Sequence, residues 1–182
     1  MLAISYLDIV RLRGDLHIGG LLSVNELGIP IEFIHSEQIR PTELQTSLYG
    51  STLGRYLLLD VIGKGLVDAS QQKAAPLVVN GKDLLALGQR VKRPVCFIQR
   101  TENRPLSDSG AFEWLSETEL QAQLGEHRSP ILVQVFSRDN FAAEKTIPGL
   151  GECGASFDVL EPMGRIRRIL DALQREQVGQ GA

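Results

Sequence analysis

Near its start the chain alternates loosely between apolar and polar side chains, in the period-two pattern of β-strands. Residues 5–13 and 16–26 are rich in β-branched and aromatic residues, and residues 29–34 (IPIEFI) follow a turn-forming Asn-Glu-Leu-Gly segment. We therefore expect three consecutive antiparallel strands. Pro30 should begin the third strand or lie on a sheet edge, because proline cannot donate a ladder hydrogen bond.

Two glycines interrupt the second of these strands. Gly19 and Gly20 are adjacent within an otherwise apolar run. Paired glycines in a strand indicate either a bulge or a place where another part of the molecule approaches closely. Both interpretations remain open at this point.

The period changes from two to that of a helix after residue 41. Thr42 and Gln45 fit a capping box, so we expect the longest helix to begin there. Its apolar face is very broad, which predicts packing on both a sheet and a neighbouring helix and could also serve a homodimer. The face consists of Leu44, Leu48, Leu53, Tyr56, Leu57, Leu59, Val61, Ile62 and Leu66. Gly50 and Gly54 each cost about 1 kcal/mol in a helix interior, so we expect a break near Gly50.

The remaining chain supplies shorter elements. Residues 77–79 and 95–99 are apolar runs typical of buried strands, and the helical segment 82–91 between them predicts a parallel pair. The second half should then add a linker, a helix, a strand, a long polar loop and a closing helix. These are expected at residues 100–108, 112–124, 131–136, 137–156 and 158–175.

Together these elements predict a mixed α/β fold. Its antiparallel N-terminal meander continues into parallel strands, and its helices pack on the sheet. We expect residues 1–100 to form the core and residues 101–182 to form a C-terminal extension packed on the same core.

Composition narrows the functional classes. A chain of 182 residues with a formal charge of −3 lacks the overall basic excess typical of nucleic-acid binders, although a local basic patch is still compatible with it. No run approaches the roughly 18 apolar residues of a membrane span, and we expect a cytoplasmic protein. The two cysteines form no CxxC pair, and Cys96 in the run VCFI is expected to be a buried thiol.

The order of elements resembles one family of enzymes. Three antiparallel strands, a helix and a parallel strand–helix–strand unit are the order found in ribonuclease-H-like nucleases, including the endonuclease V type. The resemblance implies carboxylates on the first strand and on neighbouring elements, because two divalent cations need oxygen ligands. Asp8 has the first-strand position. Asn80 stands where an acid is expected after the fourth strand, and Asp83 follows it, so Asp8 and Asp83 are the metal candidates. The alternative is that Asp8 faces outward from its strand.

Most other polar candidates lie between residues 19 and 49. We predict a contact surface there, made of Glu32, His35, Glu37, Arg40 and Tyr49. If Glu32 is buried, Arg40 or Arg55 could be its ion-pair partner. On the closing helix, the arginines at 165, 167, 168 and 175 should point mostly outward as a solvated face that could touch nucleic acid or an acidic patch of a protein.

These observations leave two functional hypotheses and identify no cofactor. The main one is a non-catalytic binding or scaffold protein that acts through contacts with a protein partner or a second copy of itself. The alternative is a ribonuclease-H-like metal-dependent nuclease, or a degenerate, inactive relative of one. Convergence of Asp8, Glu26 or Glu32, and Asp83 within metal-bridging distance would favour active catalysis.

Overall fold

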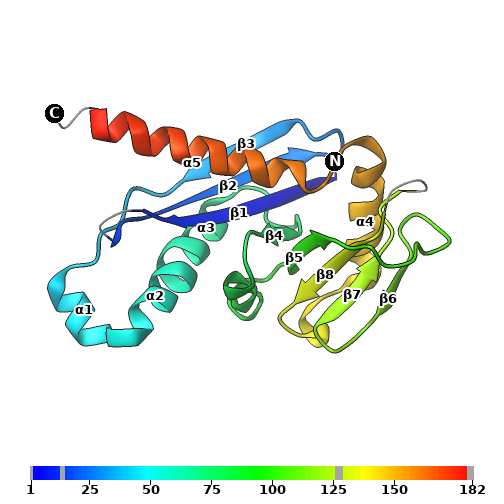
Figure 1. Ribbon diagram of the computed structural model, residues 1–182, viewed down its shortest axis with the longest axis horizontal. Helices are drawn as coiled ribbons and strands as arrows, with labels where there is room; N and C mark the ends of the chain where they lie inside the picture. The colour runs from blue at the N-terminus through cyan, green and yellow to red at the C-terminus, as the bar shows by residue number, and fades with distance from the viewer. Residues whose placement is uncertain (1, 13–14, 126–128, 180–182) are drawn as a thin grey trace.

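A computed structural model describes residues 2–12, 15–125 and 129–179. Within these residues, eight strands form one mixed sheet with helices on both faces (Figure 1). Across the sheet their order is β3-β2-β1-β4-β5-β8-β7-β6. The strands are β1 (Ala3–Arg11), β2 (His17–Asn25), β3 (Pro30–His35), β4 (Leu77–Val79), β5 (Val95–Arg100), β6 (Phe112–Trp114), β7 (Glu119–Ala122) and β8 (Ile131–Val135). The predicted mixed α/β fold is confirmed.

The N-terminal meander and the parallel strands meet at β1. β1 pairs with β2 in antiparallel register along its whole length, and it pairs with β4 in parallel on its other side. β5 continues the parallel run, whereas β8, β7 and β6 extend the sheet with antiparallel pairs. β3 is an edge strand that begins at Pro30, as its missing N–H requires.

The long helical segment breaks where glycine allows it. It comprises α1 (Glu43–Tyr49), η2 (Gly50–Thr52), α2 (Leu53–Tyr56), η3 (Leu57–Gly63) and α3 (Lys64–Ala69). Thr42 and Gln45 form the predicted capping box, and Gly50 ends α1 with a φ of 53°. Leu57, Leu59 and Ile62 of η3 are buried, and Leu59 and Ile62 belong to the core cluster on one face of the sheet. α1 projects from it with no buried residue, and the homodimer remains a prediction.

Two helical layers approach the sheet closely at the glycine pair of β2. A Cβ atom on Gly19 would lie 2.4 Å from Cγ2 of Ile62 in η3. On the opposite face, a Cβ on Gly20 would lie 3.2 Å from side-chain carbons of Ile166 and Leu170 in α5 (Glu161–Gly179). The glycines therefore permit close approach on both faces. The irregularity in β2 lies elsewhere, between Ser23 and Val24.

Two predictions for the second half of the chain are wrong. The expected helix at 112–124 is the hairpin of β6 and β7, because β7 gains a full ladder of hydrogen bonds beside β8. The expected loop at 137–156 contains α4 (Ala143–Ser156). Its three glycines and Pro148 are poor helix formers, but Ile147, Leu150 and Cys153 lie fully buried at helical spacing. Tertiary packing outweighs local propensity at both places.

Two further helical segments complete the structure. η4 (Lys82–Gln89) connects β4 to β5 and packs with η3 against one face of the sheet, and η5 (Arg138–Asn140) is a single turn before α4. α5 lies along the other face, over β1 and β2 (Figure 1). The middle of β1 is consequently covered on both sides.

Candidate functional site

Asp8 lies in the middle of β1 and is only 1% exposed. Its carboxylate accepts two hydrogen bonds from Arg167 of α5, with Nε 2.8 Å from Oδ2 and Nη2 3.3 Å from Oδ1. The alternative expectation that Asp8 faces outward is wrong, and Arg167 departs from the mostly outward arginines of α5 by turning toward the sheet. A carboxylate removed from water needs a charge partner, and α5 supplies it.

The other acidic candidates do not join Asp8. The parallel register pairs Leu7 with Val79, which places Asn80 beside Asp8, and the Asn80 N–H donates to the Leu7 carbonyl at 3.0 Å. Asp83 is exposed in the first turn of η4, which packs on the face of the sheet opposite α5. Among the described residues, no group of three His, Cys, Asp or Glu side chains could hold a metal ion. The residues present do not fit the pair of divalent cations that ribonuclease-H-like nucleases use.

A pocket of about 320 Å³ lies beside the Asp8–Arg167 pair. Tyr6, two residues before Asp8 on the same strand face, and Met163, one turn before Arg167, both line it together with Asn80. The Tyr6 hydroxyl is buried without a hydrogen-bond partner, and burial raises its pKa, so it stays protonated. The remaining walls are mostly apolar.

Glu32 has a structural role on the other face of the sheet. Its carboxylate accepts hydrogen bonds from Ser70 Oγ at 2.6 Å, from the Gln71 N–H at 2.7 Å and from Ser23 Oγ at 3.3 Å. The predicted partners Arg40 and Arg55 are not among these donors, and the nearby charge is that of Arg93. Partial burial of Glu32 acts to raise its pKa, but these hydrogen bonds and Arg93 together lower it below the ordinary value of 4.5. Glu32 thereby joins the edge strand β3 to the end of α3.

Replacing Glu32 by glutamine should lower the free energy of unfolding by about 1 kcal/mol at pH 7, since charge-assisted hydrogen bonds are lost but the site is partly open to water. Because the pKa of Glu32 is lowered in the folded state, its carboxylate stabilises the protein at any pH above the pKa of the unfolded state. That contribution is lost as the pH falls through the lower pKa of the folded state. The difference between wild type and Glu32→Gln should therefore shrink as pH falls below 4.5. Urea melts at pH 7, 5 and 3.5 measure it, and a difference independent of pH would contradict this role.

The remaining contact-surface candidates do not form one cluster. His35 and Glu37 are exposed at the end of β3, and His35 Nδ1 lies 2.9 Å from the Ser36 carbonyl. Tyr49 stacks on Tyr56 at 4.7 Å between ring centroids, at the α1–α2 junction. Of the five candidates, Arg40 alone lines a large cleft.

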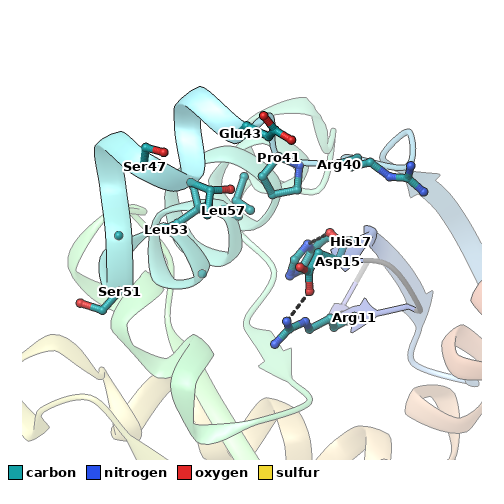
Figure 2. A pocket seen from close by; sticks show the side chains of 13 residues that line it. Arg11, Asp15, His17, Arg40, Pro41, Glu43, Ser47, Ser51, Leu53 and Leu57 are labelled. Carbon is teal, nitrogen blue, oxygen red and sulfur yellow. Dashed lines mark hydrogen bonds and ion pairs between the residues drawn. The ribbon is translucent and has the colours of Figure 1, made fainter.

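That cleft lies between Arg11, Asp15 and His17 on one side and the projecting helices on the other, and its volume is about 780 Å³ (Figure 2). Arg11 and Asp15 form an ion pair on one wall, where His17 Nδ1 also lies 3.0 Å from the Asp15 carbonyl. Arg40 and Glu43 contribute one charge of each sign from the other side, so the formal charges of the lining cancel. The rest of the lining includes the hydroxyl side chains of Thr46, Ser47 and Ser51.

Neither thiol is suited to nucleophilic chemistry. Burial raises the pKa of Cys96 to about 12, and burial with neighbouring carboxylates raises that of Cys153 to about 11. Both are therefore neutral thiols near pH 7. The expected burial of Cys96 is confirmed.

No protein-family model and no curated protein matches the sequence. Solved structures do match it. The endonuclease V of Streptomyces avermitilis superposes with a TM-score of 0.62 at 12% identity, over 97% of this chain and 82% of that one. The protein has the endonuclease V fold. Human ENDOV gives a TM-score of 0.53 at 14% identity, over 100% of this chain and 86% of that one.

A further match is an endonuclease V bound to DNA. The Ciona intestinalis endonuclease V, in complex with a 24mer DNA containing an inosine followed by a ribo-adenosine, gives a TM-score of 0.54 at 10% identity, over 100% of this chain and 87% of that one. The fold overturns our main functional prediction of a scaffold acting through protein–protein contacts. The fold is the one that our alternative hypothesis, a ribonuclease-H-like nuclease or a degenerate relative, implied. No helix in the described ranges is long and apolar enough to cross a membrane.

Proposed function

We propose that this protein binds nucleic acid as a non-cleaving relative of endonuclease V. One observation carries the proposal: on an endonuclease V fold, the carboxylate of the first strand is bound by an arginine. The fold supports action on nucleic acid. The ion pair between Asp8 and Arg167 argues against metal-dependent hydrolysis.

The donor set around Asp8 explains why cleavage is not expected. A metal site of the two-ion type needs several carboxylate oxygens converging on one point. Here the Asp8 carboxylate is bound by Arg167, and the neighbouring strand offers the neutral Asn80. Of the chain's other candidate acids, Asp83 and Glu32 lie away from the α5 face. Glu26 follows Asn25 at the end of β2, whereas Asp8 pairs with Gly20 in the middle of that strand.

Local positive charge is available despite the net charge of −3. α5 carries four arginines and three acids, Glu161, Asp171 and Glu176. Arg40 adds an exposed guanidinium at the cleft, with no ion-pair partner within the part of the chain that the structure describes. Such patches bind phosphates even on an acidic protein, with an affinity that depends on salt.

Fluorescence anisotropy of labelled single-stranded DNA, duplex DNA and single-stranded RNA tests the proposal. In EDTA, at least one of these should bind with an affinity that falls as salt rises, because phosphate contacts release counterions. Binding without metal is the distinguishing result. No binding of any of the three at 50 mM salt and 50 μM protein would overturn it.

A further inference from the structure

We propose that Arg167 contacts the phosphodiester backbone of the bound nucleic acid directly, as a built-in cation at the centre of the fold. The inference rests on the proposed function and specifies which residue of the site meets the phosphate. It follows from the disagreement between the fold, which implies metal ions, and the residues present around Asp8.

The geometry leaves part of the Arg167 guanidinium free for a second partner. Arginine has five N–H donors, of which Nε and one Nη2 N–H face Asp8. Asp8 is 1% exposed, whereas the Arg167 side chain is 46% exposed. One edge of the planar group is therefore held by a buried carboxylate, and among the described residues no hydrogen bond engages the remaining N–H groups of this half-exposed side chain.

A guanidinium held in this way is well suited to bind a phosphate. Its planar fork matches phosphate oxygens, and fixing one edge in advance reduces the side-chain entropy lost on binding. Because the charge of Asp8 neutralises that of Arg167, we expect the guanidinium to bind phosphate with moderate affinity. The tetrahedral anion is attracted by the exposed N–H groups and not by a net charge.

The surroundings on α5 are compatible with an anion. Arg168, the next residue, has a side chain 72% exposed, with only a 3.7 Å contact to Glu161. Glu161 is held by Arg165, which also donates to the Gly28 carbonyl at 2.7 Å. Asp171, one turn beyond Arg167, is the nearest acid along the helix that has no ion pair within the described ranges.

Three variants separate the effect of the Arg167 charge from the effect of its ion pair with Asp8. Asp8→Asn keeps Arg167 and removes its counter-charge. Asp8→Asn/Arg167→Gln removes the cation as well while keeping two amides able to hydrogen-bond in the buried position. Arg104→Gln, an exposed arginine in the loop before β6, is the matched control for the loss of one positive charge. Circular dichroism melts establish that each variant is folded at the assay temperature.

Anisotropy titrations of the labelled strand in EDTA then measure affinity and its salt dependence. Asp8→Asn should bind at least as tightly as wild type. The double variant should bind about 5- to 10-fold more weakly than Asp8→Asn, and its slope of log affinity against log salt should be smaller by about 0.7 for a single strand, the value of one phosphate contact. Arg104→Gln should change the affinity by no more than about twofold and should leave the slope close to that of wild type.

The outcomes separate this inference from the proposed function. If wild type binds and the double variant matches Asp8→Asn in affinity and slope, Arg167 does not contact phosphate, although nucleic-acid binding stands. If Asp8→Asn binds much more weakly than wild type, the carboxylate itself takes part and the inference is wrong. If wild type does not bind, the proposed function fails first.

Discussion

Replacing Arg167 by alanine should lower the free energy of unfolding by about 3 kcal/mol, the lower end of the cost of removing one partner of a buried ion pair. The reason is the asymmetry of the pair. Asp8 is 1% exposed, so removing the guanidinium leaves this side chain buried without its partner, in a sheet covered by α5 on that face. Urea melts at pH 7 with a two-state analysis measure the change.

The converse change should cost less. Asp8→Asn leaves a guanidinium that is 46% exposed and remains hydrated, so we expect a loss of about 1 kcal/mol. The double variant Asp8→Asn/Arg167→Gln should be more stable than Arg167→Ala, since no buried charge is left uncompensated. Equal losses for Arg167→Ala and Asp8→Asn would contradict the asymmetry, and a double variant no better than Arg167→Ala would contradict the pairing.

Replacing Gly19 by alanine should lower the free energy of unfolding by about 2 kcal/mol, within the range for overpacking a dense core. The new methyl group would lie 2.4 Å from Ile62 Cγ2 and 3.0 Å from Leu66 Cδ1. Cγ2 of Ile62 is attached directly to Cβ and cannot rotate away alone. The layer of η3 and α3 would have to move off the sheet.

Gly54→Ala is the matched control, because a Cβ there meets nothing within 4 Å and α2 is helical at that point. Its greater helix propensity should raise the free energy of unfolding by up to about 1 kcal/mol. Opposite signs for the two glycine-to-alanine changes are expected in parallel urea melts. A neutral Gly19→Ala would mean that the two layers are loosely packed at β2.

Local pattern predicted the first half of the fold well, for physical reasons. The strand alternation, the strand start at Pro30 and the capping box at Thr42 each depend on residues that are close together in the sequence. Each is present in the structure. The hairpin of β6 and β7 and helix α4 depend on distant partners. Because α4 contains three glycines and a proline, helix propensity does not predict it. The burial of its apolar residues accounts for the helix.

The sequence indicated Asp8 as a site residue but did not indicate its partner Arg167. Asp8 has apolar neighbours on both sides in a strand. If both faces of the sheet are covered, an aspartate in such a strand needs a charge partner. Its partner is 159 residues away. Helical periodicity could not single out Arg167 among the arginines of α5, because its neighbours Ile166 and Leu170 already account for the apolar face.

The most direct test of the account is to incubate an end-labelled strand, at protein concentrations that bind it, with 5 mM Mg²⁺ or Mn²⁺ and to analyse its length on a denaturing gel. We predict that the strand is bound and remains intact with either cation. Shortened products that form with wild type and disappear with Asp8→Asn would show a working metal-dependent active site and would contradict the account.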